Sequence, residues 1–322
     1  LPRSSTLILP RIRPAVSDPT LNPSGPRPHA YIVMFETLDL NAALDKAEYK
    51  RQLERLDVEL PALQRAVYEH RVPVLIVFEG WYASGRGDAI GRLVHRFDPR
   101  GTQVHVTHVS SEAARLRPWL WRFWQRLPAK GSIGIFDRSW YYLLWNRRFE
   151  KALDAVTWER RLQEIDDFER QLVDGGTILI KFWLHIGQKE QKRRLKSWAK
   201  DEVQRWRVSD EDWNRHEHYQ ERLELAEAML ARTHTAIAPW SLIEAEDDRH
   251  RRVRVLDTVA EMLRRGLRER GIPEKRLQPL PEEAPEGETP PSFAAEDTLP
   301  REHRVPADSL LARVDRTLRL DQ

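Results

Sequence analysis

The 322-residue chain contains no cysteine and no long apolar run. Without cysteine, disulfides, thiolate metal sites and cysteine nucleophiles are excluded, which is typical of proteins from a reducing compartment. No apolar segment approaches the roughly 18 residues that span a bilayer, and residues 7–10 are too short for the core of a signal peptide. The sequence therefore predicts a cytoplasmic protein with no membrane partner.

The chain also has little net charge. It carries 53 Lys and Arg against 50 Asp and Glu, a balance of +3, so any strongly positive field must be local. A polyanionic partner is permitted, but a general nucleic-acid surface is not indicated. The chain has twelve tryptophans, but Trp119, Trp121 and Trp124 lie too close together for a spaced base-stacking ladder. Nucleic acid is not expected as a partner.

Composition divides the chain into five segments. Residues 1–33 are rich in Pro, Ser and Arg and predict a disordered head, residues 34–70 an N-terminal helical segment, and residues 71–268 the main domain. Pro and Glu dominate residues 269–306, which predicts an extended linker. In the tail, residues 307–322, Val314 to Asp321 share three of eight positions with Leu38 to Asp45. Chance similarity and the start of a second repeat explain this equally well.

Hydrophobic periodicity predicts alternating helices and strands. Asp45 followed by Glu48 is a helix-start signal, and apolar residues recur at helical spacing from Leu53 to Val67. Short apolar runs predict strands at 74–78, 104–106, 133–136, 178–184 and 242–244. Helices are expected near 89–94, 116–127, 158–172, 188–198, 218–231 and 249–264. This order predicts an α/β fold with a parallel sheet and helices on both faces.

A glycine-rich turn follows the first expected strand, where residues 78–87 read FEGWYASGRG. A strand that ends in such a turn and opens a helix presents backbone N–H groups and a helix dipole to an anion. We expect Gly80, Ser84, Gly85, Arg86 and Gly87 to bind phosphate there. The usual loop has lysine where Arg86 stands and a hydroxyl residue where Gly87 stands, so the motif alone is explained equally well by a tight turn.

Asp137 decides between these explanations. It lies at the end of an expected strand, about fifty residues after the loop, where phosphoryl-transfer enzymes keep the carboxylate that holds or positions Mg²⁺. In a parallel sheet, ligands gather at the carboxyl ends of the strands, so the loop and Asp137 would face one crevice. The alternative is an aspartate that caps the following helix.

Phosphoryl transfer also needs cations around the phosphates. Arg122, Arg126 and Arg138 are candidates near the expected crevice. A basic run provides candidates for a mobile lid or a groove lining: Lys192, Arg193, Arg194, Lys196, Lys200, Arg205 and Arg207. For any one of them, a solvated helix face is the better explanation, but the set gains weight beside a phosphate loop.

Several motifs together resemble the family-2 polyphosphate kinases over residues 35–267. They are Glu79-Gly80-Trp81 with Gly85 and Gly87, Leu120-Trp121-Arg122-Phe123-Trp124, Phe136-Asp137-Arg138-Ser139-Trp140-Tyr141, Lys181-Phe182-Trp183-Leu184-His185-Ile186 and Ala238-Pro239-Trp240. The resemblance implies a P-loop kinase-like fold with a helical lid near 188–216. It implies an enzyme that uses inorganic polyphosphate and Mg²⁺ to phosphorylate nucleoside mono- or diphosphates.

The resemblance also assigns roles to residues. The glycines would hold phosphate, Asp137 would serve the metal or activate the acceptor phosphate, and Arg138 would clamp phosphate as a catalytic residue together with Arg86. Lys192, Arg194, Arg207 and Arg122 would be further phosphate ligands, and Glu169 matches a family feature more loosely. Two positions depart from the family loop, because Tyr82 replaces an aspartate and Arg86 a lysine. Arginine keeps the charge but not the geometry of lysine.

Tandem members of this family transfer phosphate from polyphosphate to AMP and carry a degenerate loop in their first copy, which this chain resembles. The leading hypothesis is therefore a polyphosphate-dependent nucleotide phosphotransferase that favours AMP over ADP. The alternatives are a catalytically impaired phosphate-binding domain with a structural or oligomerisation role, and an ATP-dependent nucleoside monophosphate kinase. Asp88 could partly replace the lost loop carboxylate, and a homo-oligomer is left open.

Overall fold

A single parallel sheet organises the protein in this computed structural model, which describes residues 34–107, 114 and 116–279. The sheet has the order β2-β3-β1-β4-β5, and every neighbouring pair is parallel. The strands are β1 (Val74–Gly80), β2 (Thr102–Val106), β3 (Ile133–Asp137), β4 (Ile178–His185) and β5 (Trp240–Glu244). All five predicted strands are confirmed. β1 and β4 are buried along their whole length, as expected of strands covered on both faces.

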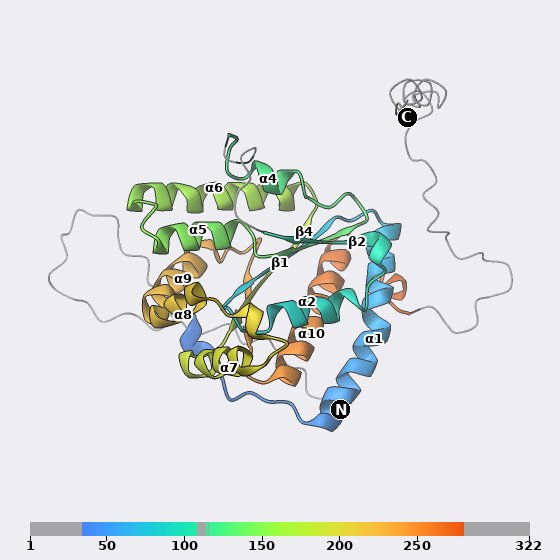
Figure 1. The fold of residues 1–322 in the computed structure, drawn as a ribbon. Helices are drawn as coiled ribbons and strands as arrows, with labels where there is room; N and C mark the ends of the chain where they lie inside the picture. Colours follow the sequence, from blue (N-terminus) through green and yellow to red (C-terminus); the bar gives the residue numbers. More distant parts are fainter. Residues whose placement is uncertain (1–33, 108–113, 115, 280–322) are drawn as a thin grey trace, which may run out of the picture. The chain divides into compact units, whose positions relative to one another are not determined.

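Helices cover both faces of the sheet (Figure 1). On one side lie α4 (Trp121–Trp124), α5 (Trp140–Phe149), α6 (Ala155–Asp174) and α9 (Tyr219–Thr233); on the other lie α1 (Lys46–Glu69), α2 (Arg86–Val94) and α10 (Asp248–Glu269). The predicted α/β fold is confirmed. Asp45 caps α1 by accepting hydrogen bonds from the N–H groups of Ala47 and Glu48, and α1 packs along α10.

One predicted helix is shorter than expected, and two helices were not predicted. The helix expected at 116–127 is limited to the single turn of α4 within the described residues, because Pro118 and Pro128 bracket it and neither can donate a helical hydrogen bond. α5 was not predicted, since its residues WYYLLWNRRF are apolar on most sides and show little periodicity. α8 (Asp210–Glu217) was also missed, although Ser209 and Asp212 form a capping box that marks its start.

The segment 188–217 lies over the glycine-rich turn. It consists of α7 (Gln188–Lys200), a 3₁₀ turn at Arg205–Arg207 and α8. Gln191 donates a hydrogen bond to the carbonyl of Tyr82 (3.2 Å), and the hydroxyl of Tyr82 donates to the carbonyl of Arg207. The segment predicted as a helical lid therefore contacts the loop directly.

The chain ends bear on the predicted boundaries only in part. Residues 1–33 and 280–322 lie outside the described residues, so the disordered head, most of the linker and the tail with its repeat are not described. The first part of the predicted linker is packed, because Ile272 and Leu277 are buried in the main core. No described helix has the length and apolarity needed to cross a membrane.

Candidate functional site

The loop between β1 and α2 presents open backbone N–H groups. Gly85 is the N-cap of α2, and no side chain caps this helix end. Gly80 has φ +134°, and a Cβ there would lie 2.3 Å from the carbonyl oxygen of Leu184. Gly85 has φ +85°, and its Cβ would lie 2.3 Å from the guanidinium carbon of Arg251. Gly80 is therefore required by close backbone approach as well as by conformation, whereas Gly85 is favoured mainly by its positive φ, since a Cβ there would meet only the end of the Arg251 side chain.

Asp137 lies beside the loop because β3 pairs with β1, with Phe78 opposite Asp137. Arg86, the first residue of α2, bridges the two. Its Nε donates to the Asp137 carboxylate at 2.5 Å, and its Nη1 lies 3.4 Å from the carbonyl of Gly80. The sheet register thus brings the loop and Asp137 together at one edge of the sheet.

The residues after Asp137 are fixed by a buried carboxylate. Glu79 accepts hydrogen bonds from the Ser139 N–H, the Ser139 hydroxyl and the Tyr142 N–H, at 2.7, 2.7 and 3.2 Å. Burial raises the pKa of Glu79 against the effect of Arg86 and these donors. Arg138, which follows Asp137 and precedes Ser139 in the chain, has φ +66°. Glu79 therefore anchors the start of α5 and, with it, the position of Asp137 and Arg138.

A cavity of about 1250 Å³ opens in front of the loop. We call it the loop cavity, lined by the loop (81–88), one side of α7, the turn at Arg205–Arg207 and the start of α10. Its arginines are Arg86, Arg193, Arg194, Arg207, Arg249, Arg251 and Arg252, and its acids are Asp88, Glu246, Asp247 and Asp248. Because arginine forks match phosphate oxygens, this lining suits an extended polyanion.

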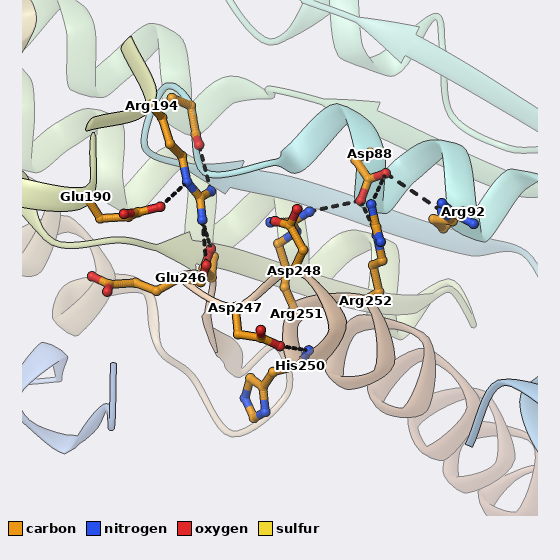
Figure 2. Close-up of polar contacts among 12 residues, drawn as sticks. Asp88, Arg92, Glu190, Arg194, Glu246, Asp247, Asp248, His250, Arg251 and Arg252 are labelled. Atoms are coloured by element: carbon orange, nitrogen blue, oxygen red, sulfur yellow. Dashed lines mark hydrogen bonds and ion pairs between the residues drawn. The ribbon is translucent and has the colours of Figure 1, made fainter. Parts of the chain in front are cut away.

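The carboxylate of Asp88 is held by α10 (Figure 2). Arg251 donates to it at 2.9 Å and Arg252 at 2.7 Å, while Arg251 also reaches Asp248 at 2.5 Å. Burial alone would raise the pKa of Asp88, but the hydrogen bonds from Arg252 and Arg251 hold it below its usual value. The arginines of α10 therefore hold the carboxylate of Asp88, which is not free to replace the carboxylate lost from the loop.

Two buried polar atoms at the loop have no hydrogen-bond partner among the described residues. They are the Ser84 hydroxyl oxygen and the Nε of Arg251, whose residues are 1% and 2% exposed. Buried polar atoms without partners are uncommon in folded proteins. Both atoms lie near Gly85 and the uncapped start of α2, where a bound anion could supply the missing hydrogen-bond partner.

Arg194 has a different environment from the one that the sequence predicted. Its guanidinium donates to the carbonyls of Ala83, Ala245 and Glu246 at 2.7–2.9 Å, and to Glu190 at 2.6 Å (Figure 2). It lines the loop cavity, but most of its donors are used to join α7 to the loop and to the β5–α10 connection. Arg194 thus links three segments of the chain at the edge of the cavity.

The remaining predicted ligands are divided among several places. Ser84, Gly85, Arg86, Gly87 and Arg207 line the loop cavity, as does Arg193. Gly80 and Arg138 line a smaller neighbouring pocket. Arg122 lines a separate cavity of about 530 Å³ beside α5. Lys192 is exposed and is not among the described residues that line the loop cavity. Burial and the positive charge of Lys192 lower the pKa of His216.

Glu169 is a core residue. It forms an ion pair with Lys181 at 2.7 Å and accepts hydrogen bonds from Tyr141 and Trp140. Both charged side chains are almost fully buried, at 2% and 0% exposure. These contacts explain why Glu169 and Lys181 are charged residues in the core, and none of them involves the loop.

The carboxylates near the loop do not form a metal site. Asp137 is paired with Arg86, Asp88 with Arg251 and Arg252, and Glu79 is saturated by donors. Among the described residues, no three His, Asp or Glu side chains are grouped to hold a metal ion. Mg²⁺ prefers several oxygen ligands and often takes them from phosphates. Within the described part of the chain, the carboxylates at the loop are thus occupied by protein partners.

The comparison with known proteins agrees with this architecture. The family described as Polyphosphate kinase 2 matches residues 43–270. This chain belongs to the polyphosphate kinase 2 family. The predicted resemblance is confirmed.

The polyphosphate:AMP phosphotransferases among the relatives in the polyphosphate kinase 2 family are longer than this chain. The polyphosphate:AMP phosphotransferase of Pseudomonas aeruginosa is 39% identical over 228 residues, which are 70% of this chain and 46% of that protein. The protein of the same name from Pseudomonas syringae pv. tomato is 36% identical over 73% of this chain and 47% of its own length. The chain thus spans about half the length of these curated relatives.

A solved structure supports the same assignment. A Pseudomonas aeruginosa crystal structure described as a polyphosphate kinase 2 has a TM-score of 0.71 and 37% identity. The similarity covers 74% of this chain and 52% of that chain. At this identity the likeness extends to the polyphosphate kinase 2 fold of sheet, loop and covering helices.

The cations of α10 were missed by sequence reasoning. Arg249, Arg251 and Arg252 are three of the seven arginines that line the loop cavity. They follow a strand by only a few residues and start a helix, as does the loop arginine. The basic residues after β5 could have been found by asking which helix starts share the carboxyl edge of the sheet.

Proposed function

We propose that the chain transfers a phosphoryl group between inorganic polyphosphate and a nucleotide, with AMP favoured over ADP. The observation that carries the proposal is the loop cavity, where an uncapped helix start and seven arginines face a volume of about 1250 Å³. An extended, multiply charged chain makes use of such a lining. The names of the two curated relatives support AMP as the acceptor.

The residues divide the proposed work between binding and reaction. The N–H groups at Gly85 to Gly87, with Arg251 and Arg252 nearby, would hold phosphates of the chain. Asp137 and Arg138 would lie at the reacting phosphate, positioned by Glu79. Reaction then requires Arg86 to exchange the Asp137 carboxylate for a phosphate oxygen, because one guanidinium fork cannot serve both fully.

Mg²⁺ remains a prediction drawn from the family resemblance. The carboxylates at the loop are paired with arginines, so any Mg²⁺ would depend mainly on phosphate oxygens for its ligands. Cytoplasmic location and the absence of a nucleic-acid partner likewise stay predictions.

A donor and acceptor matrix tests the proposal. Purified chain is supplied with polyphosphate or ATP as donor and with AMP, ADP or GDP as acceptor, and products are separated by chromatography. We expect the fastest turnover with polyphosphate and AMP. Turnover with ATP alone would instead support an ordinary nucleoside monophosphate kinase, and salt-sensitive polyphosphate binding without any turnover would support the catalytically impaired alternative.

A further inference from the structure

A small pocket adjoins the loop cavity, and four of its ten lining residues are arginines, among aromatic and neutral residues. We call it the four-arginine pocket, lined by Arg86, Arg138, Arg215 and Arg222 with Tyr82 and Tyr142. It shares Tyr82 and Arg86 with the loop cavity. No carboxylate is among the described residues that line it. The pocket therefore combines positive charge with a position next to Asp137.

Arg222 is the most unusual member of this pocket. It comes from α9 and is 4% exposed, yet no ion pair to its guanidinium occurs in the described part of the chain. Its Nη2 donates to the side-chain oxygen of Asn146 at 3.0 Å, and its guanidinium lies 4.0 Å from the Trp145 ring centre and 4.6 Å from that of Phe149. Burying a cation with only neutral partners is unfavourable.

The other arginines of the pocket differ in how far they are neutralised. Arg138 places its guanidinium 4.4 Å from the Tyr142 ring centre, and no ion pair to it occurs among the described residues. Arg215 is paired with Glu211 and Asp212, and Arg86 with Asp137. Burial and the neighbouring Arg215 lower the pKa of Arg222 to about 10. Two of the four cations are thus left to neutral contacts in a confined space.

We propose that the four-arginine pocket is a subsite for a single terminal phosphate group, with Arg222 and Arg138 as its main ligands. Several guanidinium groups without a competing carboxylate are the arrangement that phosphate oxygens match best. The inference rests on the proposed function for the class of ligand. The terminal phosphate could belong to the polyphosphate chain or to the nucleotide, and the two sources share this chemistry.

The pocket must widen to admit phosphate. Its free volume is about 20 Å³, which suits roughly one water molecule. Arg86 lines the pocket and is bound to Asp137. A phosphate that draws Arg86 away from Asp137 would enlarge the pocket and release the carboxylate in the same movement. Binding at this subsite would therefore couple to exposure of Asp137.

Equilibrium titration without turnover tests the subsite. One arm uses tripolyphosphate alone and the other uses AMP alone, on wild type and on Arg222→Met. We expect Arg222→Met to weaken binding by about 10-fold to 100-fold in at least one arm, as for loss of a hydrogen bond between charged groups. The arm that weakens identifies the source of the phosphate. Unchanged affinity in both arms, with the fold intact, would overturn the proposal.

Three further variants separate a ligand role from a structural one. Asn146→Ala removes the side-chain partner of Arg222 but leaves the cation, so affinity should stay within about 3-fold of wild type. Arg265→Met removes an exposed charge from α10 and should change neither arm. If Arg222→Met fails to fold, Arg222→Lys decides, because lysine keeps the charge without the fork. Wild-type affinity of Arg222→Lys in both arms would then overturn the proposal.

The binding assay and the turnover assay fail independently. A chain that binds tripolyphosphate or AMP through Arg222 but transfers no phosphate would contradict the proposed function and support the subsite. A chain that turns over with undiminished ligand affinity in Arg222→Met would do the reverse.

Discussion

The loop cavity and the four-arginine pocket share Tyr82 and Arg86 but treat charge in opposite ways. In the loop cavity, Arg251 and Arg252 are bound to Asp88, and Arg251 also to Asp248. In the four-arginine pocket, Arg222 and Arg138 meet rings and an amide. Paired cations keep their place without ligand, whereas unpaired cations gain most when an anion arrives. We therefore expect the first region to bind the polyphosphate chain and the second to hold a single phosphate group.

The largest expected effect is at Asp137, whose partner Arg86 lines both regions. Asp137→Asn should lower the formation of ADP from AMP and polyphosphate by at least about 100-fold, since it removes the carboxylate with which Arg86 forms its ion pair. The rate is measured by product chromatography. Asp174→Asn, an exposed change on α6, is the control and should retain wild-type turnover. Undiminished activity of Asp137→Asn would remove Asp137 from the mechanism.

The second prediction concerns Trp81, which lines both the loop cavity and the four-arginine pocket. Its indole N–H donates to Nδ1 of His185 at 3.2 Å, and burial lowers the pKa of His185 to about 4. The folded state therefore favours neutral His185, whereas the unfolded chain protonates it below about pH 6.5. The contribution of His185 to the free energy of unfolding is complete above pH 6.5 and is lost as pH falls through 4. The loss should be about 3 kcal/mol.

Urea unfolding at pH 7.5 and pH 4 measures this loss. His185→Gln keeps an acceptor for Trp81 but cannot be protonated in this range, so its stability should change less between the two pH values. An equal pH dependence of wild type and His185→Gln would show that other groups carry the effect.

The third prediction weakens the loop cavity while leaving the pocket unchanged. Arg251→Met should lower the affinity for long polyphosphate about 10-fold, because it removes a charged partner beside the open start of α2. It should also lower the free energy of unfolding by about 2 kcal/mol, since Asp88 and Asp248 lose a partner. Calorimetric titration and chemical unfolding measure the two changes. Equal polyphosphate affinities for Arg251→Met and Arg265→Met would contradict the role of α10 in binding.

The smallest expected effect tests the altered loop. Tyr82→Asp combined with Arg86→Lys restores the side chains that the family loop carries, and should raise turnover several-fold. The physical reason is that lysine forms a less directional pair with Asp137 than the arginine fork does. Arg86→Lys alone is the matched control for the added carboxylate. A fall in turnover in the double variant would mean that Arg86 is adapted to this chain's own mechanism.

Local signals in the sequence predicted most of the fold. The five strands are short apolar runs, and the glycine pattern places the loop directly after β1. Asp137 could be assigned because the carboxyl ends of neighbouring parallel strands meet. α5 could not be found in this way, since tertiary burial on several sides removes the periodicity on which helix prediction depends.

The partners of the site residues were beyond reach of the sequence. The pairing of Arg86 with Asp137 depends on a side-chain direction across about fifty residues. The use of Arg194 by three carbonyls depends on the distance between α7 and the loop. Arg222 lies in an amphipathic helix where a solvated arginine is the ordinary expectation, and only its burial beneath α5 distinguishes it.

The most direct test of the account is titration of the wild-type chain with long polyphosphate over a range of salt concentrations. We predict saturable binding that weakens as salt rises, because exposed arginines of the loop cavity contribute screened charge interactions. The affinity should fall in Arg251→Met and stay at the wild-type value in Arg265→Met. No binding at low salt, or the same affinity in all three proteins, would contradict the assignment of the loop cavity as a polyphosphate site.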